Sequence, residues 1–168
     1  MAVIKQKEQR VGIYIDAQNM YHSAKNLYQA KVNFKEVLKT AVAGRKLIRA
    51  IAYVIKTESG EERAFFDALT RIGIEIKVKD LQIFPGGMKK GDWDVGMAVD
   101  AIEQSEKLDA VVLITGDGDF VPLAEFLKFK SGCQVEIIAF SKSASARLKE
   151  VADDFIDLCQ DPKRYLIK

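Results

Sequence analysis

The sequence is poor in the residue types that build zinc sites, disulfide frameworks and collagen-like repeats. Its 168 residues include one histidine, two cysteines and three prolines. Cys133 and Cys159 lie far apart and form no C-x-x-C pair, so they are expected to be reduced core thiols. A Cys/His zinc site would need more ligands in one cluster than the chain offers, and a histidine-based triad would depend on His22 alone.

Long apolar runs and a strong charge imbalance are also missing. No run approaches the roughly 20 residues of a membrane-spanning helix, and the first ten residues lack the apolar stretch of a secretory signal. We therefore expect a cytoplasmic protein without membrane contact. The 26 basic and 24 acidic residues leave a net charge of +2, which neither demands nor excludes a nucleic-acid partner.

The composition is typical of one globular domain. It is 48% hydrophobic and 30% charged, which argues against disorder. A chain of 168 residues can bury one sizeable core but is short for two. We expect a polar N-terminal extension over residues 1–10, a single domain over 11–160 and a basic C-terminal tail over 161–168.

Strand and helix patterns alternate along the chain. Apolar runs predict buried strands over residues 11–15, 47–55, 110–115 and 135–140, and strict alternation predicts an edge strand over 74–79. Between them, helical spacing predicts helices capped by Asn19 and Asn33, and further helices over 61–72, 95–102, 120–130 and 144–151. The helix over 95–102 is expected to bury Val95, Ala98, Val99 and Ile102. This rhythm predicts an α/β fold with a mostly parallel central sheet and helices on both faces.

Acidic residues lie where ligands bind in such a sheet. Asp117 and Asp119 follow the most hydrophobic strand, Asp16 ends the first strand, and Asp94 opens a helix. The carboxyl ends of parallel strands share one edge, so these four side chains are expected to converge. Packed carboxylates repel one another unless a cation lies between them, and carboxylate oxygens suit Mg²⁺ or Mn²⁺. The sequence predicts one or two such ions and metal-assisted chemistry on a phosphoester.

Each acid also has a purely structural interpretation. Asp94 and Asp119 can cap the helices that follow them, and Asp16 can satisfy loop backbone. Asp100 lies about 140° around its helix from Val95, away from the apolar stripe, so periodicity alone indicates a solvated side chain.

Two weaker candidates accompany the acids. Lys90 follows a glycine-rich turn and can steer a phosphate, although a solvated charged loop explains it equally well. Ser141 follows the strand over 135–140 at the same sheet edge, where it can hydrogen-bond a metal-bound water or a capping amide. Trp93 and Tyr53 can stack a base, but an isolated aromatic is more often part of the core.

Three ordered motifs resemble one family. They are IDAQN at residues 15–19, KGDWDV at 90–95 followed by AVDA at 98–101, and TGDGDF at 115–120. In this order and within the β-α rhythm, they resemble the NYN domains, and most of all the LabA-like branch of that PIN-related nuclease superfamily. The resemblance runs from about Val11 to Leu158, nearly the whole chain.

The resemblance implies a Rossmann-like, three-layer PIN fold and metal-dependent ribonuclease chemistry. It implies Mg²⁺ or Mn²⁺ as cofactor, single-stranded RNA as partner, and products with 5′-phosphate and 3′-hydroxyl ends; a homodimer stays open. The acids matched to the catalytic and metal-binding positions are Asp16, Asp94, Asp117 and Asp119. Supporting positions matched to the motifs are Asn19, Asp100 and Thr115, and the resemblance implies that Asn19 contacts a metal-bound water or a phosphate. Ala17 departs from the glycine that many relatives carry, which narrows backbone freedom beside the site.

Two other functions stay open at this stage. A PIN-like scaffold can bind RNA or regulate without cleaving it. A phosphatase of the haloacid dehalogenase type is suggested by the acidic loop at 116–119, but that chemistry needs a second acid two residues after Asp16. Gln18 stands there instead.

Overall fold

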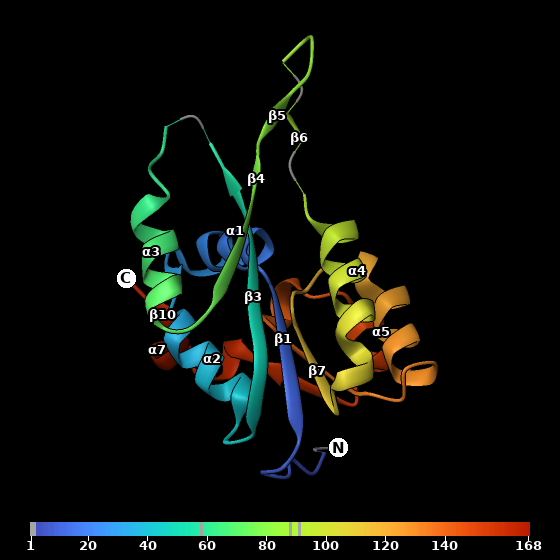
Figure 1. Cartoon of the computed structure of the whole chain (residues 1–168). Helices are drawn as coiled ribbons and strands as arrows, with labels where there is room; N and C mark the ends of the chain where they lie inside the picture. The colour runs from blue at the N-terminus through green and yellow to red at the C-terminus, as the bar shows by residue number, and fades with distance from the viewer. Residues whose placement is uncertain (1–2, 58, 88, 91) are drawn as a thin grey trace.

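A six-stranded sheet forms the centre of the protein (Figure 1). The computed structural model describes residues 3–57, 59–87, 89–90 and 92–168, with the backbone alone at 82, 83, 89 and 90. The strand order is β4-β3-β1-β7-β8-β9 and every pair is parallel. The strands are β1 (Arg10–Asp16), β3 (Lys46–Lys56), β4 (Glu75–Asp80), β7 (Ala110–Ile114), β8 (Gln134–Ala139) and β9 (Asp154–Asp157).

The strand order reverses between β1 and β7. From β1 the chain adds β3 and β4 on one side, then returns to add β7, β8 and β9 on the other. Such a reversal leaves a crevice at the carboxyl ends of the two central strands, the usual ligand position in open α/β sheets. The residues that follow β1 and β7 therefore face each other across this crevice.

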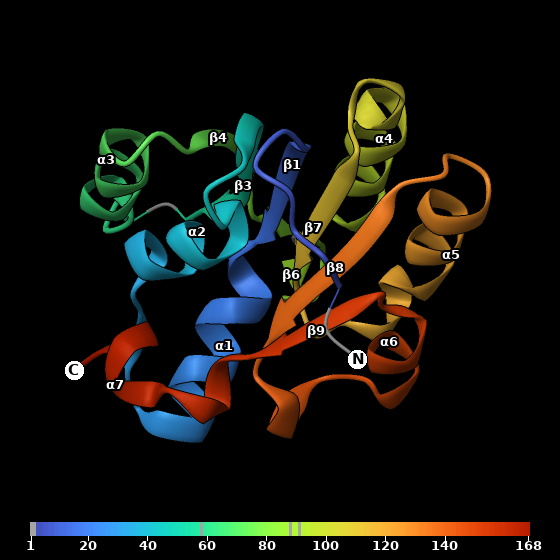
Figure 2. The ribbon, with the colours of Figure 1, turned by 90° about the horizontal axis from the view of Figure 1, so that it is seen from below.

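Helices cover both faces of the sheet (Figure 2). One face packs against α1 (Ala17–Tyr28), α2 (Phe34–Val42), α3 (Arg63–Arg71) and α7 (Pro162–Tyr165). The other packs against α4 (Asp94–Gln104), α5 (Val121–Phe129) and α6 (Ala146–Val151). Two separate apolar clusters fill these interfaces, which confirms the three-layer α/β/α fold expected from the sequence. None of the described helices combines the length and apolar character that crossing a membrane requires.

Short elements complete the structure. β5 (Gln82–Ile83) and β6 (Lys89–Lys90) form an antiparallel arm that extends beyond β4 (Figure 1). β2 (Lys31–Val32) pairs antiparallel with β10 (Leu166–Ile167), so the C-terminal residues pack against the domain, with Tyr165 buried. The 3-10 helices are η1 (Ser105–Lys107), η2 (Gly118–Phe120), η3 (Ser141–Ser143) and η4 (Leu158–Gln160).

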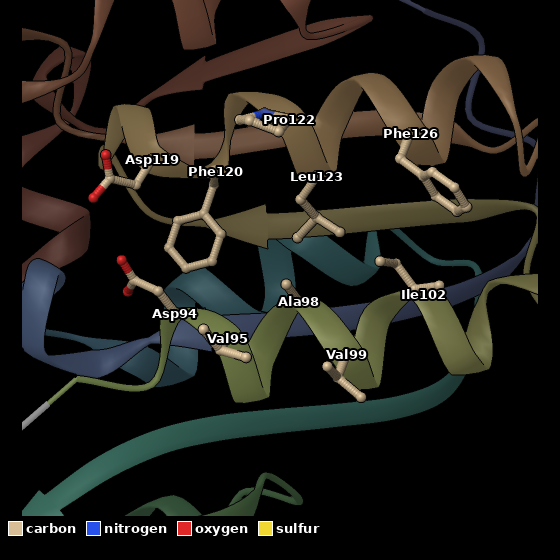
Figure 3. A pocket seen from close by; sticks show the side chains of 10 residues that line it. All are labelled: Asp94, Val95, Ala98, Val99, Ile102, Asp119, Phe120, Pro122, Leu123 and Phe126. Carbon is tan, nitrogen blue, oxygen red and sulfur yellow. The ribbon is translucent and has the colours of Figure 1, made fainter.

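The fourth helix buries a different face from the one expected. Met97 and Ala101 of α4 are fully buried against the sheet, whereas Val95 and Val99 are 77% and 53% exposed. The predicted stripe of Val95, Ala98, Val99 and Ile102 was therefore wrong as the core-facing stripe. Apolar residues occur on both sides of this helix, so periodicity could not select between them. Ala98 and Ile102 project instead toward α5, where Leu123 and Phe126 face them (Figure 3).

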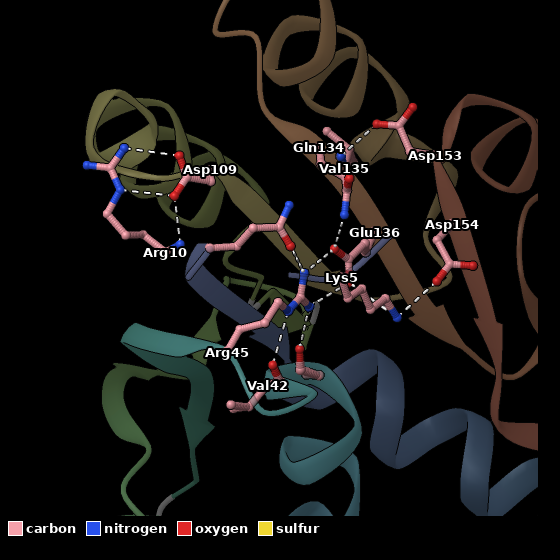
Figure 4. A network of polar contacts seen from close by, with 12 residues as sticks. Lys5, Arg10, Val42, Arg45, Asp109, Gln134, Val135, Glu136, Asp153 and Asp154 are labelled. Atoms are coloured by element: carbon pink, nitrogen blue, oxygen red, sulfur yellow. Dashed lines mark hydrogen bonds and ion pairs between the residues drawn. The ribbon is translucent and has the colours of Figure 1, made fainter. Parts of the chain in front are cut away.

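A buried ion pair closes the amino-terminal end of the sheet (Figure 4). The side chains of Arg45 and Glu136 are fully buried and joined by two hydrogen bonds, at 2.7 and 2.9 Å. Arg45 also donates to the carbonyls of Ala41 and Val42. Lys5 lies 3.6 Å from Glu136 and 3.0 Å from Asp154, which ties the N-terminal segment to the same network. With a further hydrogen bond from Arg45 to Oε1 of Gln9 at 3.2 Å, all five N–H groups of the guanidinium are used, as a buried charge requires.

Candidate active site

Asp16 stands at the junction of β1 and α1. Its Oδ1 accepts a hydrogen bond from the backbone N–H of Asn19 at 3.1 Å, so Asp16, rather than Asn19, caps α1. An acid is favoured there because it satisfies a free N–H and meets the positive end of the helix dipole. Burial nevertheless raises the pKa of Asp16, while the hydrogen bonds from Asn19 and Thr115 lower it.

Thr115 links the ends of the two central strands. It is fully buried directly after β7, and its Oγ1 donates to Oδ2 of Asp16 at 3.0 Å. The same oxygen accepts from the backbone N–H of Asp117 at 3.1 Å. One hydroxyl therefore sets the distance between two of the predicted acids.

Asn19 makes a second bridge between α1 and the loop after β7. Its Oδ1 accepts from the backbone N–H of Gly116 at 2.9 Å. The side chain expected to contact metal water or phosphate thus holds the acidic loop in place in this structure. Asn19 connects two elements that are far apart in sequence and adjacent at the crevice.

The acidic loop approaches its neighbours too closely for larger residues. A Cβ at Gly118 would lie 2.9 Å from Oγ of Ser145, and one at Gly116 would lie 3.1 Å from Cα of Ala144. Asp117 caps η2 through its Oδ1, which accepts from the N–H of Asp119 at 2.9 Å. The two glycines let the loop pack on the segment before α6, and this packing fixes the carboxylate of Asp117 at the crevice.

Asp94 reaches the same place from a third element. It is the first residue of α4, and the preceding Trp93 anchors the helix start to the sheet. The Nε1 of Trp93 donates to the carbonyl of Val54 at 2.9 Å, and its ring lies 5.4 Å from that of Tyr53. At Gly96 a Cβ would lie 2.6 Å from the Trp93 ring, so only glycine lets the helix close over the indole.

Three of the four predicted acids converge. Asp16, Asp94 and Asp117 each place one carboxylate oxygen within 4.8 Å of the other two. Burial and then the charges of Asp117 and Asp16 raise the pKa of Asp94 to about 7. Three oxygen donors whose mutual repulsion is relieved by a cation form a suitable ligand set for Mg²⁺ or Mn²⁺. The residues present therefore fit such an ion.

The fourth acid and the lysine are placed differently. Asp119 is exposed and lines the same cleft, but it is not one of the three acids that converge. Its part in metal binding stays a prediction. The side chain of Lys90, on β6, lies outside the described part of the structure.

Two supporting candidates lie away from the three acids. Asp100 accepts hydrogen bonds from Tyr53 and Lys77, both at 2.7 Å. Its side chain is only 15% exposed, so the solvated position indicated by helix periodicity was wrong. Ser141 donates its N–H to Asp157 and accepts from Lys149 through its carbonyl. In this structure Asp100 holds α4 against β3 and β4, and the backbone of Ser141 joins β9 and α6.

The cleft around the acids has a volume of about 340 Å³ and contains residues that sequence reasoning did not select. Asp92 repeats, two positions before Asp94, the spacing of Asp117 and Asp119, a signal that could have identified it. His22 follows Gln18 by one helical turn, so the start of α1 at Ala17 brings both to the cleft. The lining residues are Asp16, Gln18, Asn19, His22, Asp92, Trp93, Asp94, Asp117 and Asp119.

A second cleft begins at the same acids and runs between α4 and α5. Its volume is about 420 Å³, and it shares Asp94 and Asp119 with the acidic cleft. Apolar side chains from both helices line the rest, as Figure 3 shows. One cleft is thus acidic and the other mainly apolar, and the two meet at Asp94 and Asp119.

Comparisons with known proteins agree with this fold and identify the family. The chain is 24% identical over 164 residues to the low amplitude and bright protein LabA of Synechococcus elongatus, covering 89% of this chain and 83% of that protein. It is also similar to the crystal structure of a protein of unknown function from Vibrio parahaemolyticus. That match has 28% identity and a TM-score of 0.87 over 98% of this chain and all of the other. The family model of the NYN domain matches residues 10–159, which contain all three motifs and the converging acids. The chain therefore belongs to the NYN domain family and has its PIN-like fold.

Proposed function

We propose that this protein is a metal-dependent endoribonuclease. The observation that carries the proposal is the convergence of Asp16, Asp94 and Asp117 at the crevice where the strand order reverses. Membership of the NYN family, which is related to PIN nucleases, supports the same chemistry. The proposed substrate is single-stranded RNA, because an unpaired strand can bend to bring one phosphodiester to acids that lie in a cleft.

The three acids would hold one Mg²⁺ or Mn²⁺, with the exposed Asp119 available to a second ion or its waters. Such an ion lowers the pKa of a bound water and neutralises charge on a phosphoester. Asp16 is held in place by Asn19 and Thr115, so its carboxylate needs little rearrangement when a ligand arrives. Asp94, with its pKa of about 7, would bind such an ion in its deprotonated form, so ion binding would favour loss of its proton.

The α1 wall of the cleft provides groups for the substrate. Gln18 and His22 line it beside the acids. An amide N–H₂ and an imidazole N–H donate hydrogen bonds, and phosphate oxygens accept them. We propose that these two side chains orient the phosphodiester, while the acids position the ion.

Purified protein should cleave single-stranded RNA in the presence of Mn²⁺, and Asp117→Asn should abolish both cleavage and calorimetric Mn²⁺ binding. Asp67→Asn is the matched control, since Asp67 is an exposed acid on α3 away from the crevice. Product ends would be mapped to 5′-phosphate and 3′-hydroxyl groups. Equal cleavage by wild type and Asp117→Asn would point to a contaminant or another site. Tight RNA binding without cleavage under several metals would favour the non-catalytic function.

A further inference from the structure

The outward faces of α4 and α5 carry a large share of exposed apolar surface. Phe129 is 70% exposed and Phe126 41% exposed, in addition to Val95, Val99 and Ile102 on α4. The exposed parts of these five residues amount to roughly 500 Å², within the range of about 300–600 Å² for the largest apolar patch on a monomer, a patch that is often functional. Scattered single apolar residues need no explanation, but a patch of this size on two adjacent helices does.

Four of these five residues line the apolar groove between the two helices, and Phe129 stands at the end of α5. Phe120, Leu123 and Ala98 lie in this groove, with Phe126 and Ile102 farther along it (Figure 3). The only charged residues among those lining it are Asp94 and Asp119, both at the end next to the acidic cleft. A nucleic acid lying along the groove would need cations for its phosphates, and the lining offers none. The groove therefore suits a protein surface better than RNA.

We propose that this groove is the contact surface between two copies of this chain. α4 and α5 follow the same direction, since each leads from the carboxyl edge of the sheet back toward its amino edge (Figure 1). A two-fold axis across them places the helices of one copy antiparallel to those of the other. The apolar ridge of each α4 can then enter the groove of the other copy, as an isologous interface requires.

Charge favours this antiparallel arrangement over a parallel one. The acidic ends of the two helices, with Asp94 and Asp119, would repel each other if they met across the interface. In the antiparallel arrangement, the acidic start of each helix instead lies beside the carboxyl-terminal ends of the partner's α4 and α5. Lys107 and Lys130 lie at those ends and balance Glu103 and Glu106 there, so no excess of negative charge meets the acidic ends. Helix dipoles also favour antiparallel neighbours.

The area agrees with a stable dimer. A standard interface buries about 800 Å² on each partner, and its central part is more apolar than its rim. An apolar centre of roughly 500 Å² per copy leaves a polar rim of ordinary size. The rim would reach the edge of the acidic cleft, because the groove begins at Asp94 and Asp119.

The test is the oligomeric state of the full chain, measured by light scattering and sedimentation equilibrium without metal or RNA. Wild type should be a dimer, and Val99→Glu should raise the dissociation constant at least roughly a hundredfold, because each copy would bury an unpaired carboxylate. Val78→Glu is the matched control: Val78 is also an exposed valine, but it lies on the edge strand β4. It should leave the dimer intact.

Several results would overturn the proposal. They are a wild-type protein that is monomeric at about 100 µM, an assembly larger than a dimer, or a dimer that Val99→Glu leaves intact, whatever the effect of Val78→Glu. A monomer whose RNA affinity falls in Val99→Glu would assign the groove to RNA. If Val99→Glu does not fold, Val95→Lys at the more exposed position replaces it. Because the measurement uses neither metal nor substrate, Asp117→Asn should still dimerise, so its failure as a nuclease would not affect this result.

Discussion

The hydroxyl of Thr115 should contribute to both stability and metal affinity. It donates to Asp16 and accepts from the N–H of Asp117, at 3.0 and 3.1 Å, while fully buried. A hydrogen bond to a charged group contributes about 1.5–3 kcal/mol and a neutral one about 1 kcal/mol. Thr115→Val keeps the shape and adds buried apolar surface, which offsets part of the loss. We expect the free energy of unfolding to fall by about 2 kcal/mol.

The same substitution should weaken Mn²⁺ binding. The hydrogen bond from Thr115 lowers the pKa of Asp16, so its loss raises that pKa further and leaves the N–H of Asn19 as the remaining hydrogen bond to the carboxylate. Losses of groups that orient metal ligands typically cost about 10–100-fold in affinity, and we expect a change in that range by calorimetric titration at pH 7.

Thr115→Ser tests the contribution of the hydroxyl separately from that of the packed methyl group. Serine keeps both hydrogen bonds and loses one buried methyl group, which costs about 1 kcal/mol in urea denaturation. Its Mn²⁺ affinity should stay near that of wild type. The reasoning would be refuted if Thr115→Val bound Mn²⁺ as tightly as Thr115→Ser, or unfolded at the same urea concentration as wild type.

Two further predictions concern charge. Glu136→Ala leaves the guanidinium of Arg45 buried without its partner and should cost about 3–5 kcal/mol in urea denaturation. Glu8→Ala, which breaks an exposed pair with Lys46, should cost less than about 1 kcal/mol; equal losses would contradict the argument. The pKa of Asp94 rises from 3.8 to about 7 on folding, so the folded state favours its protonated form. Metal-free protein should therefore lose thermal stability as pH rises from about 4 to about 7, while stabilisation by Mn²⁺ grows over that interval. Asp94→Asn should flatten both profiles, and an unchanged pH profile in this variant would count against the assignment.

The sheet could be predicted from the sequence because its strands carry a strong signal. β7 consists of five fully buried apolar residues, and β4 alternates as an edge strand does. The buried face of α4 could not be predicted, because the helix carries apolar residues on both sides and only tertiary packing selects Met97 and Ala101. The N-cap of α1 was predicted at Asn19 rather than at Asp16 for a related reason. Asp16 and Asn19 are both good caps, and their ranking depends on contacts with residues 115 and 116.

The candidate site could be predicted where the acids lie at strand ends. Asp16 ends β1 and Asp117 follows β7, so the rule for ligand positions in parallel sheets was enough. Asp119 could not be separated from Asp117, since only the turn geometry of η2 directs one carboxylate inward and exposes the other. Asp100 lies on the face of α4 that meets β3 and β4. Its partners there, Tyr53 and Lys77, come together only after these two strands have paired.

Asp94 differs from the other two acids in how it is held. Asp16 and Asp117 belong to the central strand ends and accept hydrogen bonds from neighbouring backbone or Thr115. Asp94 arrives on the first turn of a helix that follows the β5-β6 arm, and the indole of Trp93 ties that turn to β3. Burial and then its acidic neighbours raise its pKa to about 7, so its anionic form is costly without a cation. Metal binding should therefore stabilise the start of α4 more than the ends of β1 or β7, because the repulsion that it removes falls on the group with the weakest local support.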